Sequence, residues 1–147
     1  MRKIDPIFVS ALYYGINKAV VDIVGTGGQV LGRESAKEMI SFLKEEGILK
    51  ENMTDREIRD LFVNLFGLAE DLKIEDREEE VVFQVIKPTL TPFLERVMKE
   101  RITPYVCPFM YLLSEIYSQN RGYKLMFKNT VPGKEGVKLI FKKIKLS

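Results

Sequence analysis

The hydrophobic and polar positions predict helices and strands in a regular order along the chain. Five stretches carry apolar residues at helical spacing, and each predicts an amphipathic helix: residues 6–24, 29–46, 54–66, 91–101 and 108–120. Four shorter stretches read as strands, the last two with strict alternation: residues 72–75, 81–86, 123–128 and 137–142. Because the strands come in adjacent pairs rather than as βαβ units, this order predicts an α+β fold, with about five helices on a four-stranded antiparallel sheet.

Local signals support the helix boundaries. Asp5 and Pro6 suit an N-cap and a first helical residue, and Thr54 to Glu57 has the spacing of a capping box. We expect Thr91 and Pro92 to cap the fourth helix. On the first helix a wide apolar face is predicted, with Ser10, Asn17, Lys18 and Asp22 away from it; the face comprises Phe8, Val9, Leu12, Ile16, Ala19, Val20 and Ile23.

Composition excludes several kinds of chemistry. The 147 residues fit a single domain over 1–147 and include no His and one Cys. The chain therefore has no Ser-His-Asp triad, no His metal ligand, no internal disulfide and no CxxC site. The net charge is +2, but residues 121–147 hold eight basic residues and one acid, which is +7, so residues 1–120 carry −5.

Four local features have a structural and a functional interpretation. Gly25 to Gly28 is a helix-to-helix turn or, less in keeping with its sequence context, a backbone loop that approaches a ligand. Cys107 is a small buried residue or a thiol activated by the start of a helix. The acidic run at 75–80 is a solvated turn rather than a cation site, because it lacks EF-hand spacing. The Lys-rich strands at 123–142 form a solvated face or bind a polyanion.

The apolar runs are interrupted before they reach the length of a membrane span, and no signal-peptide core follows the first residues. We therefore expect a cytoplasmic protein without a membrane span. Abundant Lys and Glu, with little Gln, are typical of a thermophilic source.

The pieces in order resemble the 4-vinyl reductase domain, also called the hydrocarbon-binding domain. The similarity runs from about Phe8 to Leu146, and its most characteristic part is a helix with a late Gly followed by a β-hairpin, CPFMYLLSEIYSQNRGYKLMFKN and GVKLIFKKI. The resemblance implies a twisted four-stranded antiparallel sheet, a kinship with small subunits of the TRAPP tethering complex, an apolar ligand and often a homodimer. Many members carry C-terminal Cys residues that hold a metal. The hairpin here has none, which argues against a metal and against reductase activity.

The predicted function is non-enzymatic binding of a hydrophobic small molecule, without a cofactor, metal or catalytic residue. We expect the ligand between the first helix, the fifth helix and the sheet, in contact with six residues: Phe8, Leu12, Phe109, Leu113, Tyr117 and, at the rim, Cys107. A homodimer is expected. The alternatives are a protein-interaction or tethering module that uses the same helix faces, and nucleic-acid or anionic-surface binding through the C-terminal Lys hairpin. An enzyme is the class that the sequence supports least.

Overall fold

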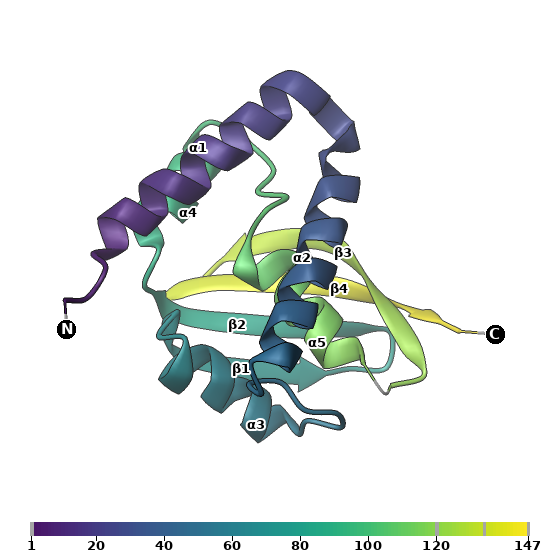
Figure 1. Ribbon diagram of the computed structural model, residues 1–147. Helices are drawn as coiled ribbons and strands as arrows, with labels where there is room; N and C mark the ends of the chain where they lie inside the picture. The colour runs from purple at the N-terminus through teal and green to yellow at the C-terminus, as the bar shows by residue number, and fades with distance from the viewer. Residues whose placement is uncertain (1, 120, 134, 147) are drawn as a thin grey trace.

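A computed structural model describes residues 2–119, 121–133 and 135–146 and has an α+β architecture (Figure 1). Four strands form one sheet in the order β1-β2-β4-β3, and all neighbouring strands are antiparallel: β1 (Ala69–Asp76), β2 (Glu80–Pro88), β3 (Tyr123–Pro132) and β4 (Gly136–Lys145). The α+β class and the four-stranded antiparallel sheet are therefore confirmed. All four strands extend beyond their predicted ends.

The helices are less regular than expected. Long α-helices occur as α1 (Pro6–Val24), α2 (Gly28–Glu45) and α4 (Thr91–Lys99). The third predicted helix is a short α3 (Asp55–Asp60) continued by a π-helical segment at Leu61–Leu65. The fifth starts with a π-helical segment at Pro108–Leu113 and continues as α5 (Ser114–Ser118). Its predicted end at Asn120 lies outside the described residues, as do Lys134 and Ser147 of the basic segment.

The capping predictions have mixed outcomes. Asp5 accepts a hydrogen bond from the Ile7 backbone N–H, and Thr54 and Glu57 form the reciprocal capping box. The Thr91 prediction is wrong. Its hydroxyl donates to the Pro88 carbonyl at 2.6 Å, and the residue before it, Leu90, stands at the N-cap.

The core lies between one face of the sheet and the segment from Pro108 to Ser118. Phe83 of β2 packs edge-on against Tyr117 and Phe141, with ring centroids 5.3 and 5.5 Å apart. The alternation predicted for the hairpin is confirmed on its inner side, where Phe141 is buried and Phe127 packs against it at 5.6 Å. Further core side chains come from α2, α3, the π-helical segment that follows α3, and α4, namely Ala36, Ile40, Leu43, Ile58, Phe62, Phe93 and Val97.

The first helix is turned differently from the prediction, although Val9 packs against the core and Lys18 and Asp22 are exposed, as expected. Its buried residues are Ser10 and Asn17, whereas Phe8 is 63% exposed and Leu12 is 51% exposed. Figure 1 shows α1 as an arm above the sheet, with α4 beside it and α2 returning to the body of the molecule. The inward side of α1 is mixed: Ser10 and Asn17 are buried there beside Val9, Tyr13 and Tyr14, which pack against the core. Phe8 and Leu12 therefore point outward.

Candidate ligand-binding site

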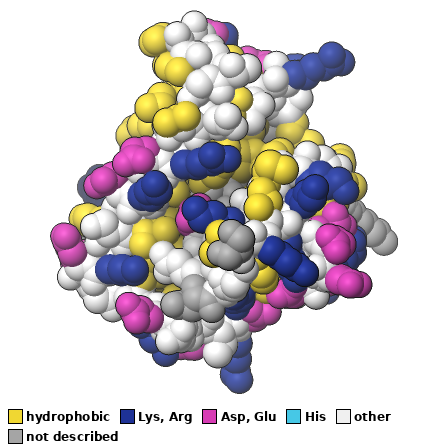
Figure 2. Space-filling view, turned by 90° about the vertical axis from the view of Figure 1, so that its right-hand side faces the viewer, with side chains coloured by type: hydrophobic (Ala, Val, Ile, Leu, Met, Phe, Trp, Pro, Cys, Tyr) yellow, Lys and Arg dark blue, Asp and Glu magenta, His cyan; other side chains and the backbone are white. Residues whose placement is uncertain are grey.

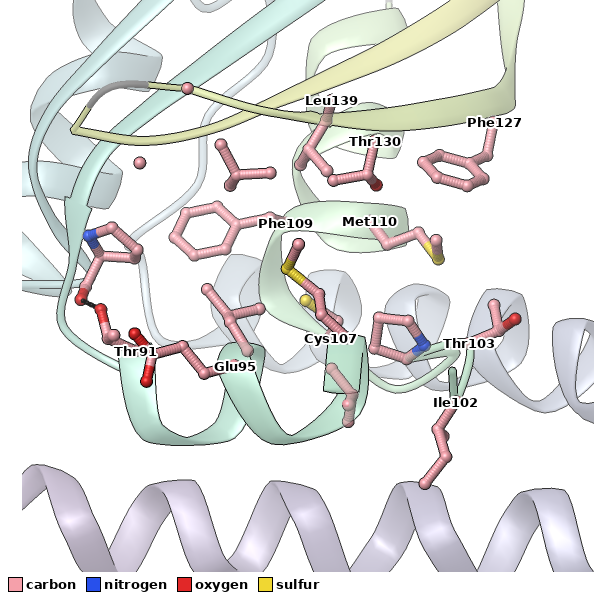
Figure 3. Close-up of a pocket in the computed structure, with 18 of the residues that line it drawn as sticks. Thr91, Glu95, Ile102, Thr103, Cys107, Phe109, Met110, Phe127, Thr130 and Leu139 are labelled. Carbon is pink, nitrogen blue, oxygen red and sulfur yellow. Dashed lines mark hydrogen bonds between the residues drawn. The ribbon is translucent and has the colours of Figure 1, made fainter. Parts of the chain in front are cut away.

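An apolar pocket of about 750 Å³ lies between α4, the loop at residues 100–107 and the β3–β4 hairpin. Figure 3 shows Thr130 and Leu139 reaching into it from the strands, Phe109 and Met110 from the π-helical segment, and Glu95 from α4. Its volume is within the range of about 300–1,000 Å³ that is usual for small-molecule sites. The site joins elements that are up to about fifty residues apart in sequence.

The inner wall of the pocket is apolar. It consists of side chains from the hairpin, from α4 and the following loop, and from the π-helical segment at Pro108–Leu113: Leu94, Val97, Met98, Ile102, Phe109, Met110, Phe127, Val137 and Leu139. Met and aromatic side chains adapt to irregular ligand shapes, because Met is flexible and polarisable and aromatic rings offer large flat surfaces. This wall is suited to an apolar ligand.

Two backbone positions in left-handed conformation lie at the edge of the pocket. Lys87 has φ +48° at the end of β2, and Arg101 has φ +57° just after α4. Non-glycine residues rarely adopt this conformation, and where they do the surrounding structure must hold them. The Lys87 N–H donates to the Glu135 carbonyl at 2.7 Å, and this bond attaches the hairpin turn to the end of β2.

The loop at residues 100–107 is held by α1. Asn17 donates through Nδ2 to the Val106 carbonyl at 2.8 Å, and its Oδ1 accepts from the Val106 N–H at 2.9 Å. Pro104 and Pro108 keep this stretch from continuing as a helix. The wall of the pocket that carries Cys107 therefore depends on a polar contact with a helix almost ninety residues away.

Cys107 lines the pocket as a buried thiol. Burial raises the pKa of this thiol, and the N–H groups of Phe109 and Met110 oppose that effect only in part. A thiol with a raised pKa is a weak nucleophile at neutral pH. The environment fits an apolar wall residue better than an activated nucleophile.

The six residues predicted to share a site are not brought together. Phe109 and Cys107 line the pocket. Leu113 and Tyr117 are buried in the core, and the Tyr117 hydroxyl donates to Asp76 at 2.9 Å. Phe8 and Leu12 lie on the outer side of α1 and do not line the pocket. The reason is the orientation of α1, which turns Ser10, Asn17 and Tyr13 toward the protein instead.

The prediction missed the side chains from α4 and the hairpin. Leu94 and Met98 are four residues apart on α4, and Val137 and Leu139 alternate on β4. Both patterns are visible in the sequence as inward faces. What the sequence does not reveal is that these two faces are separated by a gap rather than packed against each other.

The acidic side chains and the hairpin lysines bear on two further interpretations of the sequence. Within residues 2–119, 121–133 and 135–146, no group of three or more Cys, Asp or Glu side chains is placed to hold a metal ion. Of the Lys residues on the hairpin, Lys128 pairs with Glu80 at 3.3 Å, and Lys143 pairs with Asp76.

One helical stretch is long and apolar enough to cross a membrane by length and composition, although the sequence predicted no such segment. It starts at Pro6 and runs through α1 and α2 to Glu45, and little of its most apolar part is buried. The same test is also passed by core helices of soluble proteins and by signal sequences. The apolar surface of this stretch is therefore largely exposed in the structure.

Comparison with known proteins identifies a relative. The chain is 58% identical over 144 residues to Uncharacterized protein MJ0758 of Methanocaldococcus jannaschii, a match that covers 97% of this chain and 91% of the relative. No family model matches the chain. No solved structure matches it either. Identity at this level over nearly the whole length shows that the chain belongs to the same protein family as this M. jannaschii protein.

Proposed function

We propose that this protein binds a hydrophobic small molecule in the pocket between α4, the loop at 100–107 and the β3–β4 hairpin. The observation that carries the proposal is the 750 Å³ space itself, which is lined by apolar side chains from all three elements. The resemblance of the sequence to the hydrocarbon-binding domain supports the same kind of ligand. The protein acts as a sensor or carrier in this proposal, and it does so as a homodimer.

The pocket favours a ligand that is apolar along most of its length with a polar group at one end. Phe109, Met110 and Leu139 offer no strong hydrogen-bonding group inside. Thr103 and the charged residues Lys87, Glu95 and Arg101 lie around it with both signs of charge. A polar end group can reach these residues while the chain of the ligand stays in the interior.

A series of linear primary alcohols tests the proposal. In isothermal titration with butanol to decanol, each added CH₂ is expected to improve binding by about 0.8 kcal/mol, which is about fourfold, until the pocket is full. Native mass spectrometry of the purified protein then reports any ligand that co-purifies. Absence of binding for every alcohol in the series would contradict the proposal.

Two adjacent residues of β3 provide a matched pair of variants. Thr130 points into the pocket (Figure 3), whereas Val131 is 37% exposed and does not line it. Thr130→Phe is expected to abolish the increase in affinity with alcohol length. Val131→Phe is expected to leave that increase unchanged. Equal effects of the two variants would place the alcohols elsewhere. Met98→Trp narrows the same pocket from α4 and replaces Thr130→Phe if that variant does not fold.

A further inference from the structure

The outward side of α1 is a continuous apolar surface. Its residues at positions 7, 8, 11, 12, 15, 16, 19 and 23 are Ile, Phe, Ala, Leu, Gly, Ile, Ala and Ile, and we call this surface the outer face of α1. Phe8, Leu12 and Ile23 are 63%, 51% and 82% exposed. Figure 2 shows hydrophobic side chains gathered at the top of the molecule, where α1 meets α2. Contiguous apolar surface of this kind marks an interaction site.

The outer face carries no net charge. The only charged residues of α1 are Lys18 and Asp22, and they pair with each other at 2.7 Å. A partner therefore needs no charged groups to bind this surface. A second copy of the same uncharged surface is such a partner.

The solvent-accessible area of the chain is larger than a compact monomer of this mass would have. A compact monomer of 17.0 kDa exposes about 7,700 Å² by the usual scaling with mass. This chain exposes 9237 Å², which is about 1,500 Å² more than that scaling predicts. Stable homodimers bury about 1,000 Å² or more from each partner. The excess is thus of the size that a dimer interface covers.

We infer that the outer face of α1 binds the same face of a second copy of this chain, with the two helices antiparallel. The inference rests on the homodimer proposed above and names its surface. A twofold axis between Gly15 and Ile16 brings large side chains opposite other residues of the face: Phe8 against Ile23, Leu12 against Ala19 and Ile16 against Gly15. The face is therefore complementary to itself.

Gly15 supports a close approach of two helices at this point. A Cβ added there would meet nothing within 4 Å among the described residues. A glycine in the interior of a helix costs about 0.5–1 kcal/mol relative to alanine, and no contact within the described part of the chain requires it. Together with Ala11 and Ala19 it leaves a shallow groove, which lets a second helix backbone approach closely.

A membrane surface fits this helix less well than a second copy. Helices that lie on membranes carry Lys and Arg on their polar face to contact anionic lipids. The polar side of α1 instead carries Ser10 and Asn17, which are buried against the protein, and a single Lys, Lys18, which is paired with Asp22. Membrane binding is an outcome that the experiment below distinguishes.

The first experiment measures the mass of the full chain by light scattering. We expect wild type at twice 17.0 kDa, and Phe8→Asp combined with Leu12→Asp at 17.0 kDa with unchanged far-ultraviolet circular dichroism. Phe42→Asp is the matched control, because Phe42 of α2 is 61% exposed, close to Phe8 at 63%. This control is expected to remain dimeric.

The second experiment tests the antiparallel arrangement without disturbing the fold. The Gly15→Cys variant places two thiols beside the twofold axis, within the range of about 7 Å between Cα atoms that a disulfide requires. The two copies of Ile23 lie about 22 Å apart along the helices at 1.5 Å per residue. Under mild oxidation we expect Gly15→Cys to form a covalent dimer and Ile23→Cys to form none. Native Cys107 is buried and stays in both variants.

The outcomes separate this inference from the homodimer itself. A dimer that persists in the Phe8/Leu12 variant, or that is cross-linked equally by both Cys variants, overturns the interface and leaves the homodimer standing. A wild type that is monomeric at all concentrations overturns both. Flotation of wild type, but not of the Phe8/Leu12 variant, with vesicles of neutral and anionic phospholipid would assign the face to a membrane and overturn the inference.

Discussion

The side chain of Asn17 forms two hydrogen bonds with the backbone of Val106, one to its carbonyl at 2.8 Å and one from its N–H at 2.9 Å. Nδ2 also donates to the Tyr13 carbonyl at 2.8 Å, and the residue is fully buried. A polar residue in the middle of an apolar helix thus supplies the partners that the loop at 100–107 would otherwise lack. This contact joins the arm formed by α1 to the wall of the pocket.

Asn17→Ala is therefore expected to lower the free energy of unfolding by about 2–3 kcal/mol, because it leaves two partly buried backbone groups of Val106 without partners. Urea unfolding followed by circular dichroism measures this. Asn64→Ala is the control, since the Asn64 side chain donates an exposed hydrogen bond to Asp60 and its loss should change stability by less than about 0.5 kcal/mol. Equal stabilities of the two variants would show that the contact with Val106 has no structural role.

Gly32 of α2 is expected to tolerate no side chain. A Cβ there would lie 2.3 Å from the Tyr105 carbonyl oxygen and 2.7 Å from the Tyr111 ring. Gly32→Ala should lower the free energy of unfolding by about 1–3 kcal/mol through overpacking, although Ala favours helices more than Gly. Thermal unfolding of Gly32→Ala is compared with Gly122→Ala, where a Cβ meets nothing within 4 Å among the described residues. A Gly32→Ala variant as stable as wild type would contradict the close packing of α2.

Asp76 is expected to make stability depend on pH in the acid range. Burial opposes its ionisation, but hydrogen bonds from Lys143, Tyr117 and Tyr123 outweigh burial and lower its pKa below the ordinary value of 3.8. A carboxyl with a lowered folded pKa stabilises the fold above its unfolded pKa, and this contribution is lost as the pH falls through the folded value.

Asp76→Asn should therefore destabilise the protein at pH 7 by about 1 kcal/mol, a modest figure because the Asp76 side chain is partly exposed. The difference from wild type should shrink below pH 3.8. Urea unfolding at pH 7 and pH 2.5 measures it, with Glu45→Gln on the exposed side of α2 as the control. A difference that is the same at both pH values would argue against an ionised Asp76 as the centre of this network.

The Cys107 thiol is expected to react slowly in the folded protein. Burial raises its pKa, so that less thiolate is present at pH 8 than for a free thiol. Labelling with Ellman's reagent should be complete only after unfolding in guanidinium. In Phe42→Cys, the added thiol at an exposed position of α2 should react rapidly while Cys107 does not. Rapid labelling of both thiols would show that the pocket is open to the reagent at Cys107.

Most of the local structure could be predicted from the sequence, because it depends on neighbouring residues. The capping box of Thr54 and Glu57 lies within one helical turn, and the alternation of Val137, Leu139 and Phe141 follows from strand geometry. Thr91 shows the limit even at this scale. A hydroxyl that could accept from the helix instead donates to the Pro88 carbonyl, because the preceding turn brings that oxygen close.

The candidate site was predicted only in part. Phe109 and Cys107 follow from their place at the start of a helix that faces the sheet, and both line the pocket. Leu113 and Tyr117 have the same helical pattern but are buried in the core, since one helix face can line a cavity at one end and pack tightly at the other. A periodic pattern shows which side chains leave water but does not show which of them meet a partner.

The orientation of α1 shows most clearly where local pattern ends and tertiary structure begins. Its length, its Asp5 cap and its two unlike faces are properties of residues close together in the chain. Which face turns inward depends on the Val106 backbone, whose hydrogen-bonding groups are better satisfied by Asn17 than by an apolar side chain. The tertiary structure therefore buries Asn17 with Tyr13 and Tyr14 beside it and leaves Phe8 and Leu12 outward.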